Sequence, residues 1–453
     1  MRQTDHTLTR RAFFARTAAR ATALAAAPYV LPASARGADG TEAPSNRITL
    51  GHIGVGMMGR GHVRCCLSYP QAQVLAVCDV DRWRRKDAKS TVEAAYAEQR
   101  AAGTYRGCDV YTDLRPLLAR DDIDAVLIAT GDRWHALATV MAARAGKDIY
   151  CEKPACLTIA EAVAMVEEVH RYGRVFQTGL QQRSSAQFRK ACTLVQAGAI
   201  GRVRVVYVGF PGTNEHVVLP PEPVPDGLAW DQWLGPAPWR PFNSRYHIYG
   251  RPPRVVPWDF CQDFGGGNLT SNAVHAFDVV QWGLGMDGSG PVRVQPPETG
   301  GVPSLTYTYA GGVQCQVTWH LEAGKHVVPP GWDTKTRIQN FGALFVGEEG
   351  WIHVGRQGYL TAHPASILDQ PVSPEVGGGV PTHHENWLEC IRTRRQPASN
   401  VVSGCGSTIV AHLGCIAHWT GRALEWDPEH KVFPGDDEAN RWVSRPMRSP
   451  WAL

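Results

Sequence analysis

The sequence lacks the patterns that mark several common classes of protein. Its twelve cysteines form no Cys-x-x-Cys pair and no Cys/His set at zinc-ligand spacing, so we expect no metal site. Their scatter along 453 residues argues against a disulfide framework and favours buried free thiols. There is no basic run with interleaved aromatic residues, and the formal net charge is +4, so nucleic acid is not expected as a partner.

Long apolar runs are also scarce, and the one near the N-terminus belongs to an export signal. Residues 9–14 read Thr-Arg-Arg-Ala-Phe-Phe, a twin-arginine pattern, and residues 21–31 are apolar but too short for a permanent membrane helix. Residues 33–35, Ala-Ser-Ala, offer a cleavage site. We therefore predict that residues 1–45 are a signal and linker for the twin-arginine machinery. The protein would be periplasmic or otherwise extracytoplasmic, or anchored by an uncleaved signal. No other stretch approaches transmembrane length, so no integral membrane span is expected.

The region that follows begins with a strand and a glycine-rich turn. Residues 48–53 are strand-like and run into residues 54–59, Gly-Val-Gly-Met-Met-Gly. In such a loop Gly54 permits a tight turn, Gly56 lets the backbone approach a pyrophosphate, and Gly59 allows close packing of helix on strand. The helix N-terminus would then face the phosphates. This context predicts a dinucleotide site.

A carboxylate supports the same prediction. A second strand, residues 74–77, ends at Asp79, about 20 residues beyond the last loop glycine, the spacing expected for the group that binds the ribose hydroxyls. An acid at this place favours NAD over NADP because it repels a 2′-phosphate. Arg82 and Arg84 follow closely and could weaken that preference.

Strands and helices then alternate as far as residue 178. This pattern predicts an α/β fold with a doubly wound parallel sheet, an NAD-binding Rossmann domain over residues 46–182, with ligands at the carboxyl ends of its strands. The expected helices cover 82–100, 114–120, 134–145 and 159–172, and the expected strands lie near 110 and at 125–130, 148–151 and 174–178.

A different organisation is expected for residues 183–453. Strand-like runs recur with little helix between them, which predicts an α+β domain with a large, mostly antiparallel sheet and C-terminal helices. The runs are residues 203–210, 292–294, 304–309, 313–320 and 343–346. Residues 211–264 are rich in Pro, Trp and Arg and are interpreted as a long packed loop that borders the substrate cleft.

Residues 129–135 read Ala-Thr-Gly-Asp-Arg-Trp-His, residues 152–154 read Glu-Lys-Pro, and residues 177–183 read Gln-Thr-Gly-Leu-Gln-Gln-Arg. Together with a fourth segment, these resemble segments of the Gfo/Idh/MocA oxidoreductases, the family of glucose-fructose oxidoreductase and inositol 2-dehydrogenase. The run from Gly265-Gly266-Gly267 to Asp278 is the fourth, and residues 384–388 and 436–440 resemble exported members. The resemblance implies a sugar or cyclic polyol as substrate and a homo-oligomer formed through the second-domain sheet.

The resemblance and the loop together select the candidate site residues. Lys153 would face the nicotinamide and share or relay a proton, and His275 is the candidate acid or base. The candidate cofactor-binding residues are Gly54, Gly56, Met57, Met58, Gly59, Asp79, Thr130, Asp132, His135, Glu152, Lys153 and Gln181. The candidate substrate-binding residues are Lys153, Arg183, Asn272, His275 and Asp278. Structural alternatives remain open, because His135 could simply pack, Asp132 could cap a helix, and Asp278 could orient a neighbour.

Several positions depart from the family pattern. Ser271 stands where relatives commonly have Asp, Ala273 replaces a Gly, and Gly131 replaces a Pro. Near the C-terminus, Gly-Cys-Gly-Ser at 404–407 replaces Gly-His-Arg-Ser. Serine cannot act as a carboxylate base at neutral pH, so either His275 carries the proton or the chemistry differs.

The sequence leaves three alternative functions open. The first is an NAD-dependent oxidoreductase of sugars or cyclic polyols with a tightly held cofactor, loaded before export and recycled on the protein. The second is an NAD-dependent glycosidase or lyase that oxidises its substrate transiently. The third is a catalytically altered protein that binds NAD or a sugar.

Overall fold

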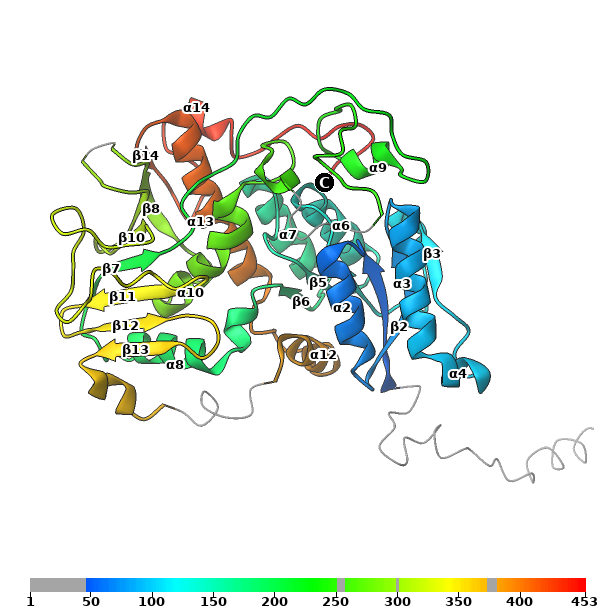
Figure 1. Ribbon diagram of the computed structural model, residues 1–453, viewed down its shortest axis with the longest axis horizontal. Helices are drawn as coiled ribbons and strands as arrows, with labels where there is room; N and C mark the ends of the chain where they lie inside the picture. Colours follow the sequence, from blue (N-terminus) through cyan, green and yellow to red (C-terminus); the bar gives the residue numbers. More distant parts are fainter. Residues whose placement is uncertain (1–45, 251–256, 299–300, 373–380) are drawn as a thin grey trace, which may run out of the picture. The chain divides into compact units, whose positions relative to one another are not determined.

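The computed structural model describes residues 46–250, 257–298, 301–372 and 381–453. The twin-arginine and cleavage motifs lie outside the described residues. Residues 48–453 form one compact unit. Within it, a parallel sheet with flanking helices is followed by a larger mixed sheet (Figure 1).

The first sheet has six parallel strands in the order β3-β2-β1-β4-β5-β6. This order confirms the predicted doubly wound sheet. Successive strands are added on one side of β1 as far as β3 and on its other side from β4 onward, and ligands bind at this switch point in such folds. Most of its strands are buried on both faces, which explains their nearly continuous apolar sequences. The strands are β1 (Ile48–Ile53), β2 (Ala72–Cys78), β3 (Asp109–Tyr111), β4 (Ala125–Ile128), β5 (Asp148–Cys151) and β6 (Phe176–Thr178).

Helices cover both faces of this sheet. One face packs against α2 (Met57–Leu67), α3 (Arg82–Ala95) and α12 (His383–Thr393). The other packs against α5 (Leu114–Leu118), α6 (Asp132–Arg144) and α7 (Ile159–Arg171). The predicted single helix over 82–100 is wrong, because Tyr96 interrupts it and α4 (Ala97–Ala101) follows separately. The Tyr96 hydroxyl accepts a hydrogen bond from Val74 N at 3.2 Å, which ties the break to β2.

The second sheet has eight strands in the order β13-β12-β11-β7-β10-β9-β8-β14. β7 and β10 pair in parallel and the other neighbours are antiparallel, so the prediction of a mostly antiparallel sheet is confirmed. The strands are β7 (Val203–Val208), β8 (Pro291–Gln295), β9 (Thr306–Tyr309), β10 (Gln314–Val317), β11 (Ala343–Gly347), β12 (Trp351–Val354), β13 (Leu360–His363) and β14 (Leu424–Glu425).

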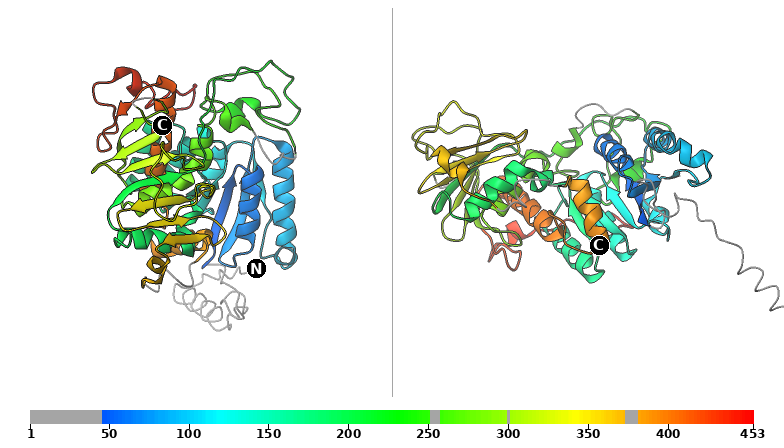
Figure 2. Two further views of the ribbon diagram at one scale, coloured as in Figure 1. Left: turned by 60° about the vertical axis from the view of Figure 1, so that its left-hand side comes forward. Right: turned by 90° about the horizontal axis from the view of Figure 1, so that it is seen from below.

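The expectation of little helix between the strand-like runs is wrong for residues 274–283, whereas the helix at residues 401–420 is one of the predicted C-terminal helices. The helices α8 (Ala186–Gln196), α10 (Val274–Gly283) and α13 (Val401–Thr420) lie between the second sheet and the first (Figures 1 and 2). Their buried side chains join those of α6 and α7 in one continuous apolar core. The shorter elements are α9 (Trp230–Leu234), α14 (Asp437–Asn440), the 3₁₀ turns Gln181–Ser184, Pro257–Phe260 and Ala365–Asp369, and a π-helical turn, Leu269–Ala273.

The helix α13 corrects the expectation that no further stretch approaches transmembrane length. Its 20 residues are long and apolar enough to cross a membrane by length and composition alone. In this fold 89% of its apolar window is buried. The apolar sequence is therefore explained by contacts with α7 and α10 on either side.

The outward face of the second sheet is partly covered by the chain itself. Leu321, Trp332 and Ile338, from the connection between β10 and β11, form a cluster with residues of β7, β11 and β12. The family resemblance assigns this face to a homo-oligomer interface, which stays a prediction. Any partner would have to contact the covering connection as well as the strands.

Candidate functional site

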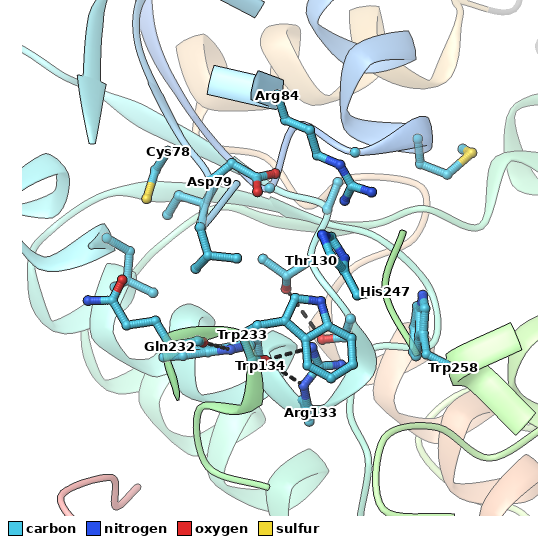
Figure 3. A pocket seen from close by; sticks show the side chains of 18 of the residues that line it. Cys78, Asp79, Arg84, Thr130, Arg133, Trp134, Gln232, Trp233, His247 and Trp258 are labelled. Carbon is cyan, nitrogen blue, oxygen red and sulfur yellow. Dashed lines mark hydrogen bonds between the residues drawn. The ribbon is translucent and has the colours of Figure 1, made fainter. Parts of the chain in front are cut away.

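A cavity of about 520 Å³ opens at the carboxyl ends of β1, β2 and β4. Its volume falls within the range of about 300–1,000 Å³ typical of small-molecule sites. Figure 3 shows Asp79 and Arg84 on one side of it and Arg133, Trp134 and Trp233 on the other. The predicted residues that line it are Gly54, Gly56, Met57, Met58, Asp79, Thr130 and Asn272.

The glycine loop has the geometry that a dinucleotide needs. Gly54 has a φ of +84°, and a Cβ there would lie 2.6 Å from the Ala129 carbonyl oxygen. A Cβ on Gly59 would lie 2.0 Å from the Gly54 oxygen, so α2 can approach β1 only because this residue is glycine. Gly56, by contrast, faces the cavity, and the nearest atom to a Cβ there would be Arg84 Nη1 at 3.3 Å. The loop therefore leaves room for a pyrophosphate beside Gly56.

Asp79 stands where a ribose carboxylate is expected. Its Oδ2 accepts from Val55 N at 2.9 Å and its Oδ1 accepts from Asp81 N at 2.9 Å, so backbone amides fix the carboxylate at the cavity wall. Each oxygen keeps a lone pair with which to accept a hydroxyl. The Arg84 guanidinium also lines the cavity and donates to Ile248 O at 3.0 Å. Arg82 instead pairs with Asp226 at 2.7 Å on the exposed surface.

The opposite wall comes from residues 211–250 and 257–264, here called the covering segment. Six of its residues line the cavity: Gln232, Trp233, His247, Trp258, Asp259 and Phe260. Trp233 stacks on Trp230 with ring centroids 4.5 Å apart, and the Arg133 guanidinium lies 3.7 Å from the Trp233 ring centroid. Arg133 Nη2 also donates to Trp233 O at 2.7 Å. Helix α6 thus fixes the tryptophan that faces the cofactor cavity.

Asp81 ties the covering segment to the first sheet. Its Oδ1 accepts from Trp83 N and caps α3, while its Oδ2 accepts from Gly250 N at 3.0 Å. His247 Nε2 lies 3.5 Å from the same oxygen. These contacts place the segment over the site. The sequence predicted that the segment borders the substrate cleft, and its residues line the larger cavity as well as the smaller one.

A second, smaller cavity of about 70 Å³ continues from the first. Met58, Ala129, Thr130, Trp258 and Asp259 line both cavities. The smaller one adds the predicted residues Asp132, Glu152 and Lys153, together with Pro154 and Ser271.

Lys153 stands at the end of β5 in this smaller cavity. Its Nζ donates to Ser271 O at 2.7 Å, which anchors the amine to the π-helical turn before α10. The structure therefore brings Lys153 beside the cofactor loop, as the Glu-Lys-Pro motif predicted.

Two further carboxyl groups crowd this lysine. Burial, and next the charge of Asp259, raise the pKa of Asp132 to about 8 against the pull of Lys153 and Arg133. Burial likewise raises the pKa of Asp259, while a backbone hydrogen bond and the charge of Lys153 oppose the rise. Asp132 Oδ2 and Asp259 Oδ1 have no hydrogen-bond partner among the described residues. The cavity thus holds carboxyl groups with high proton affinity next to an amine.

Asp259 lines the same cavity as Ser271. The turn Pro257–Phe260 approaches the three-glycine run so closely that a Cβ on Gly265 would lie 2.6 Å from Asp259 O. Gly267 N donates to the same oxygen at 2.8 Å. This turn therefore contributes a carboxyl group to the smaller cavity, where the helix position is occupied by Ser271.

Other predicted residues lie behind the walls of the two described cavities. His135 is buried, with Nδ1 2.7 Å from Pro154 O and Nε2 3.2 Å from Thr130 O, so it holds the loop that carries Lys153. His275 is also buried. When the Gln182 side-chain amide is oriented so that its oxygen accepts from Arg356, its nitrogen donates to His275 Nδ1 at 2.9 Å. Burial, and next the charges of Lys153 and Arg356, lower the pKa of His275 well below its usual value.

Arg183 and Asp278 form a buried ion pair. Arg183 Nη2 lies 2.8 Å from Asp278 and 2.6 Å from Asp287, and Ser407 Oγ donates to Asp278 at 2.9 Å. The altered segment at 404–407 thus contributes to this network, which joins the turn after β6 to α10. Gln181 donates to Glu152 Oε1 at 3.2 Å from the same turn.

Several residues of the site were not predicted from the sequence. Arg133 lies within a quoted motif, and the abundance of Trp in the covering segment was the signal for Trp233 and Trp258. Nothing in the sequence indicated Asp259 or Trp451, because both reach the cavity through tertiary contacts. Trp451 lines the larger cavity and packs edge-on against Trp134 at 4.9 Å.

Two family profiles match the chain. Residues 48–180 match the profile described as oxidoreductase family, NAD-binding Rossmann fold. Residues 207–453 match the profile described as oxidoreductase family, C-terminal alpha/beta domain.

Curated relatives resemble the chain over different lengths. Inositol 2-dehydrogenase 4 of Saccharopolyspora erythraea is 24% identical over 391 residues, 83% of this chain and 95% of that protein. The uncharacterized oxidoreductase YrbE of Bacillus subtilis is 30% identical over 157 residues, 35% of this chain and 42% of that protein.

Solved structures share the fold. The aldose-aldose oxidoreductase of Caulobacter crescentus in complex with glycerol superposes with a TM-score of 0.53 at 18% identity, covering 84% of this chain and 99% of that one. The WlbA dehydrogenase of Bordetella pertussis in complex with NADH and UDP-GlcNAcA gives 0.55 at 16% identity, covering 85% and 99%.

Proposed function

Because the chain belongs to the Gfo/Idh/MocA family of oxidoreductases, we propose that it transfers a hydride between a tightly bound NAD and a carbon of a sugar or cyclic polyol. The observation that carries the proposal is the junction of the two cavities. The larger one meets the requirements of a dinucleotide, and Lys153 stands in the smaller one where the two meet. Relatives named as inositol dehydrogenases and a levoglucosan dehydrogenase support the substrate class.

The residues divide the work between binding and chemistry. Gly54, Gly56 and Asp79 would hold the pyrophosphate and ribose, and Trp233 would cover the dinucleotide. When bound, NAD supplies the hydride acceptor next to the smaller cavity. Lys153, held by Ser271 O at 2.7 Å, is placed to bind the substrate hydroxyl and share its proton with Asp259. His275 would keep a neutral imidazole behind them.

The residues expected on the adenosine side of the site favour NAD over NADP. The Asp79 carboxylate would repel a 2′-phosphate, and Arg82 is occupied with Asp226. Arg84 remains beside the loop, where its charge suits the pyrophosphate because it lies nearest Gly56.

Export and tight cofactor binding support each other. The twin-arginine pattern at residues 9–14 favours a protein that folds and loads its cofactor before export. Outside the cytoplasm a released NAD would not be replaced, so oxidation of one sugar would have to be coupled to reduction of another. The covering segment, tied down through Asp81, favours retention of the cofactor.

Two measurements test this function. Denaturing the purified protein should release a nicotinamide nucleotide into the supernatant, and a panel of sugars and polyols should produce the absorbance band of reduced nicotinamide. Lys153→Met should keep the nucleotide but lower the rate of band formation by about 10²–10⁴-fold. The matched control is Lys335→Met, an exposed lysine far from the cavities. A Lys153→Met protein with unchanged kinetics would instead favour a protein that only binds NAD or a sugar.

A second function is favoured by one observation. Asp132, with its pKa raised to about 8 by burial, is a carboxylic acid that keeps its proton at neutral pH and could donate it to a leaving glycosidic oxygen. That acid suits the NAD-dependent glycosidase or lyase with transient oxidation. Release of an aglycone without net reduction of NAD would identify it.

A further inference from the structure

A continuous line of polar groups begins at Glu152 in the smaller cavity and leads away from the covering segment. Glu152 Oε1 lies 2.9 Å from His62 Nε2, and His62 Nδ1 lies 2.9 Å from His384 Nε2. His384 Nδ1 lies 3.6 Å from Cys65 Sγ. These contacts join the cavity to His384, which is partly exposed, through His62, which is buried.

The line continues to the protein surface. Cys65 Sγ lies 3.6 Å from the Tyr69 hydroxyl, which lies 2.8 Å from Thr382 Oγ1. Glu152 and His62 are 3% and 5% exposed, whereas Cys65 and Tyr69 are partly exposed and Thr382 is exposed. The groups therefore run from the interior to solvent in the order of their exposure.

The fold holds this line in place with three elements. His62 and Cys65 are three residues apart on α2, so their side chains share one face, and Tyr69 follows just beyond the helix. Thr382 caps α12, which fixes His384 in its first turn. The His384 ring stacks on Tyr150 of β5 with centroids 5.0 Å apart and planes inclined by 8°. Glu152 fits over Gly179, where a Cβ would lie 2.5 Å from its Oε1.

We infer that Glu152, His62 and His384 form a proton path between the catalytic cavity and solvent, with its outer end at Cys65, Tyr69 and Thr382. The inference rests on the proposed hydride transfer, because oxidation of an alcohol to a carbonyl gives the hydride to NAD and leaves one proton in the cavity. The covering segment lies on the other side, so this line offers the proton an exit when cofactor and substrate fill the site.

The proton count along the path balances. Before the oxidative half-reaction each imidazole carries its proton on Nδ1: the substrate proton reaches Glu152, Glu152 gives a proton to His62 Nε2, His62 Nδ1 gives one to His384 Nε2, and His384 Nδ1 gives one to solvent. Both rings then carry their protons on Nε2, the tautomer in which His62 donates to the Glu152 carboxylate, and the reductive half-reaction draws a proton inward through the same steps in reverse. Two coupled half-reactions therefore restore the tautomers of both imidazoles.

The electrostatics suit the passage of protons between Glu152 and His384. Burial, and next the charges of His62 and His383, lower the pKa of His384 to about 3, while Glu152 opposes the decrease. Burial alone would raise the pKa of Glu152, but its hydrogen bond with His62 and the nearby charges of His62, Lys153 and His275 bring it down to about 2. Neither Glu152 nor His384 therefore retains a proton at neutral pH, as a path that passes protons on requires.

The test separates proton release from hydride transfer. The holoenzyme is mixed rapidly with an oxidisable saccharide in weak buffer containing a pH indicator, and the nicotinamide band and indicator are followed together. In His384→Phe, which keeps a ring against Tyr150, we expect the first reduced-nicotinamide amplitude to persist and proton release to slow at least about tenfold. Imidazole in the buffer should restore the rate. Proton release that keeps pace with hydride transfer, or no rescue, would overturn the path.

The chain offers a matched control. His52 is buried beside the same cluster, but its ring nitrogens have no partner among the described residues, so His52→Leu should change neither rate. His384→Gln serves as the second variant if the phenylalanine disturbs folding, and it should show the same slow release and rescue.

A readout independent of turnover separates this inference from the proposed function. If no saccharide reduces the wild-type cofactor, the proposed function fails, and the path is tested by ¹⁵N spectra of histidine-labelled holoprotein. We expect Glu152→Gln to shift the ring nitrogens of both His62 and His384, because one hydrogen-bonded line connects them. A shift confined to His62 would show that the line is broken and would overturn the path.

Discussion

At the scale of single residues, Ser271 and Asp259 contribute to the smaller cavity in different ways. Ser271 Oγ donates to Gly267 O at 2.8 Å and its carbonyl holds Lys153. Asp259 reaches the same cavity from the preceding turn. The serine therefore anchors the lysine, and the covering segment supplies the carboxylate proposed as the base.

The first prediction concerns this carboxylate. Asp259→Asn should lower kcat by about 10²-fold or more and remove the fall in rate at acidic pH, because a general base must be deprotonated and the pKa of Asp259 is raised by burial. The measurement is the pH profile of kcat from pH 4 to 9. Asp263→Asn, in a residue that pairs with Arg240 outside both cavities, is the control. If adding Ser271→Asp to the Asp259→Asn variant restored no activity, a simple exchange of position would be excluded.

The second prediction concerns stability and pH. The pKa of Asp132 rises from its ordinary value near 3.8 to about 8 in the folded protein, so between these values the folded state holds a proton that the unfolded state has lost. The free energy of unfolding must then decrease as pH rises through that window, by up to about 1.4 kcal/mol per pH unit. Asp132→Asn should flatten the decrease.

Melting temperatures of the cofactor-free protein from pH 4 to 8 measure this effect. Asp121→Asn, in an exposed residue, should follow the wild-type curve. Equal slopes for wild type and Asp132→Asn would mean that Asp132 ionises freely in the folded state.

The residues of the site differ in how far sequence could predict them. The glycine loop, Asp79 and Lys153 each follow a strand of one sheet, β1, β2 and β5, so local pattern and spacing were enough to predict them. His275 and His135 were selected because they lie within the family-like motifs. Whether a buried imidazole lines a cavity or lies behind its wall depends on tertiary packing. Asp259 lies 106 residues from Lys153 in the chain and is brought there by glycines that allow two backbones to touch, which no local pattern reports.

At the scale of elements, the covering segment forms one wall of the larger cavity. It contributes Trp233 to the cavity, and α6 fixes that tryptophan through Arg133. Burial lowers the pKa of Arg133 to about 9, although the Asp132 carboxylate opposes the decrease. The sequence of this segment predicted a packed loop. Its position over the dinucleotide cavity depends on contacts with Asp81, which follows β2 of the first sheet.

The third prediction tests this role. Trp233→Ala should weaken retention of NAD by about 10–100-fold, because it removes an aromatic wall and its stacking on Trp230. Cofactor remaining after extensive dialysis, measured by absorbance of the denatured protein, gives the comparison. Trp239→Ala is the matched control, since Trp239 belongs to the same segment and is 64% exposed. Equal retention by the two variants would remove the covering segment from cofactor binding.

At the scale of the whole molecule, one apolar core joins the two sheets through α10 and α13. The alternation of strands and helices was enough to predict the first sheet, and β-branched runs were enough for most of the second. C-terminal helices were predicted, but the place of α13 between the two sheets was not, because this helix is apolar on nearly all sides and shows no amphipathic period. The position of such a helix becomes clear only once both of its neighbours are known.

This core also determines the state of the thiols, and the fourth prediction follows from it. All twelve cysteines are free, eleven are buried, and Cys65 is partly exposed. Burial raises the pKa of buried thiols such as Cys405 and Cys415, to about 12 and about 11, so thiolate formation is suppressed there. A thiol reagent such as dithionitrobenzoate should therefore react quickly with about one group in the native protein and with twelve after denaturation. Cys65→Ser should abolish the native reaction, and dithiothreitol should leave the melting temperature unchanged. Rapid reaction of several native thiols would show that the core opens on the timescale of labelling.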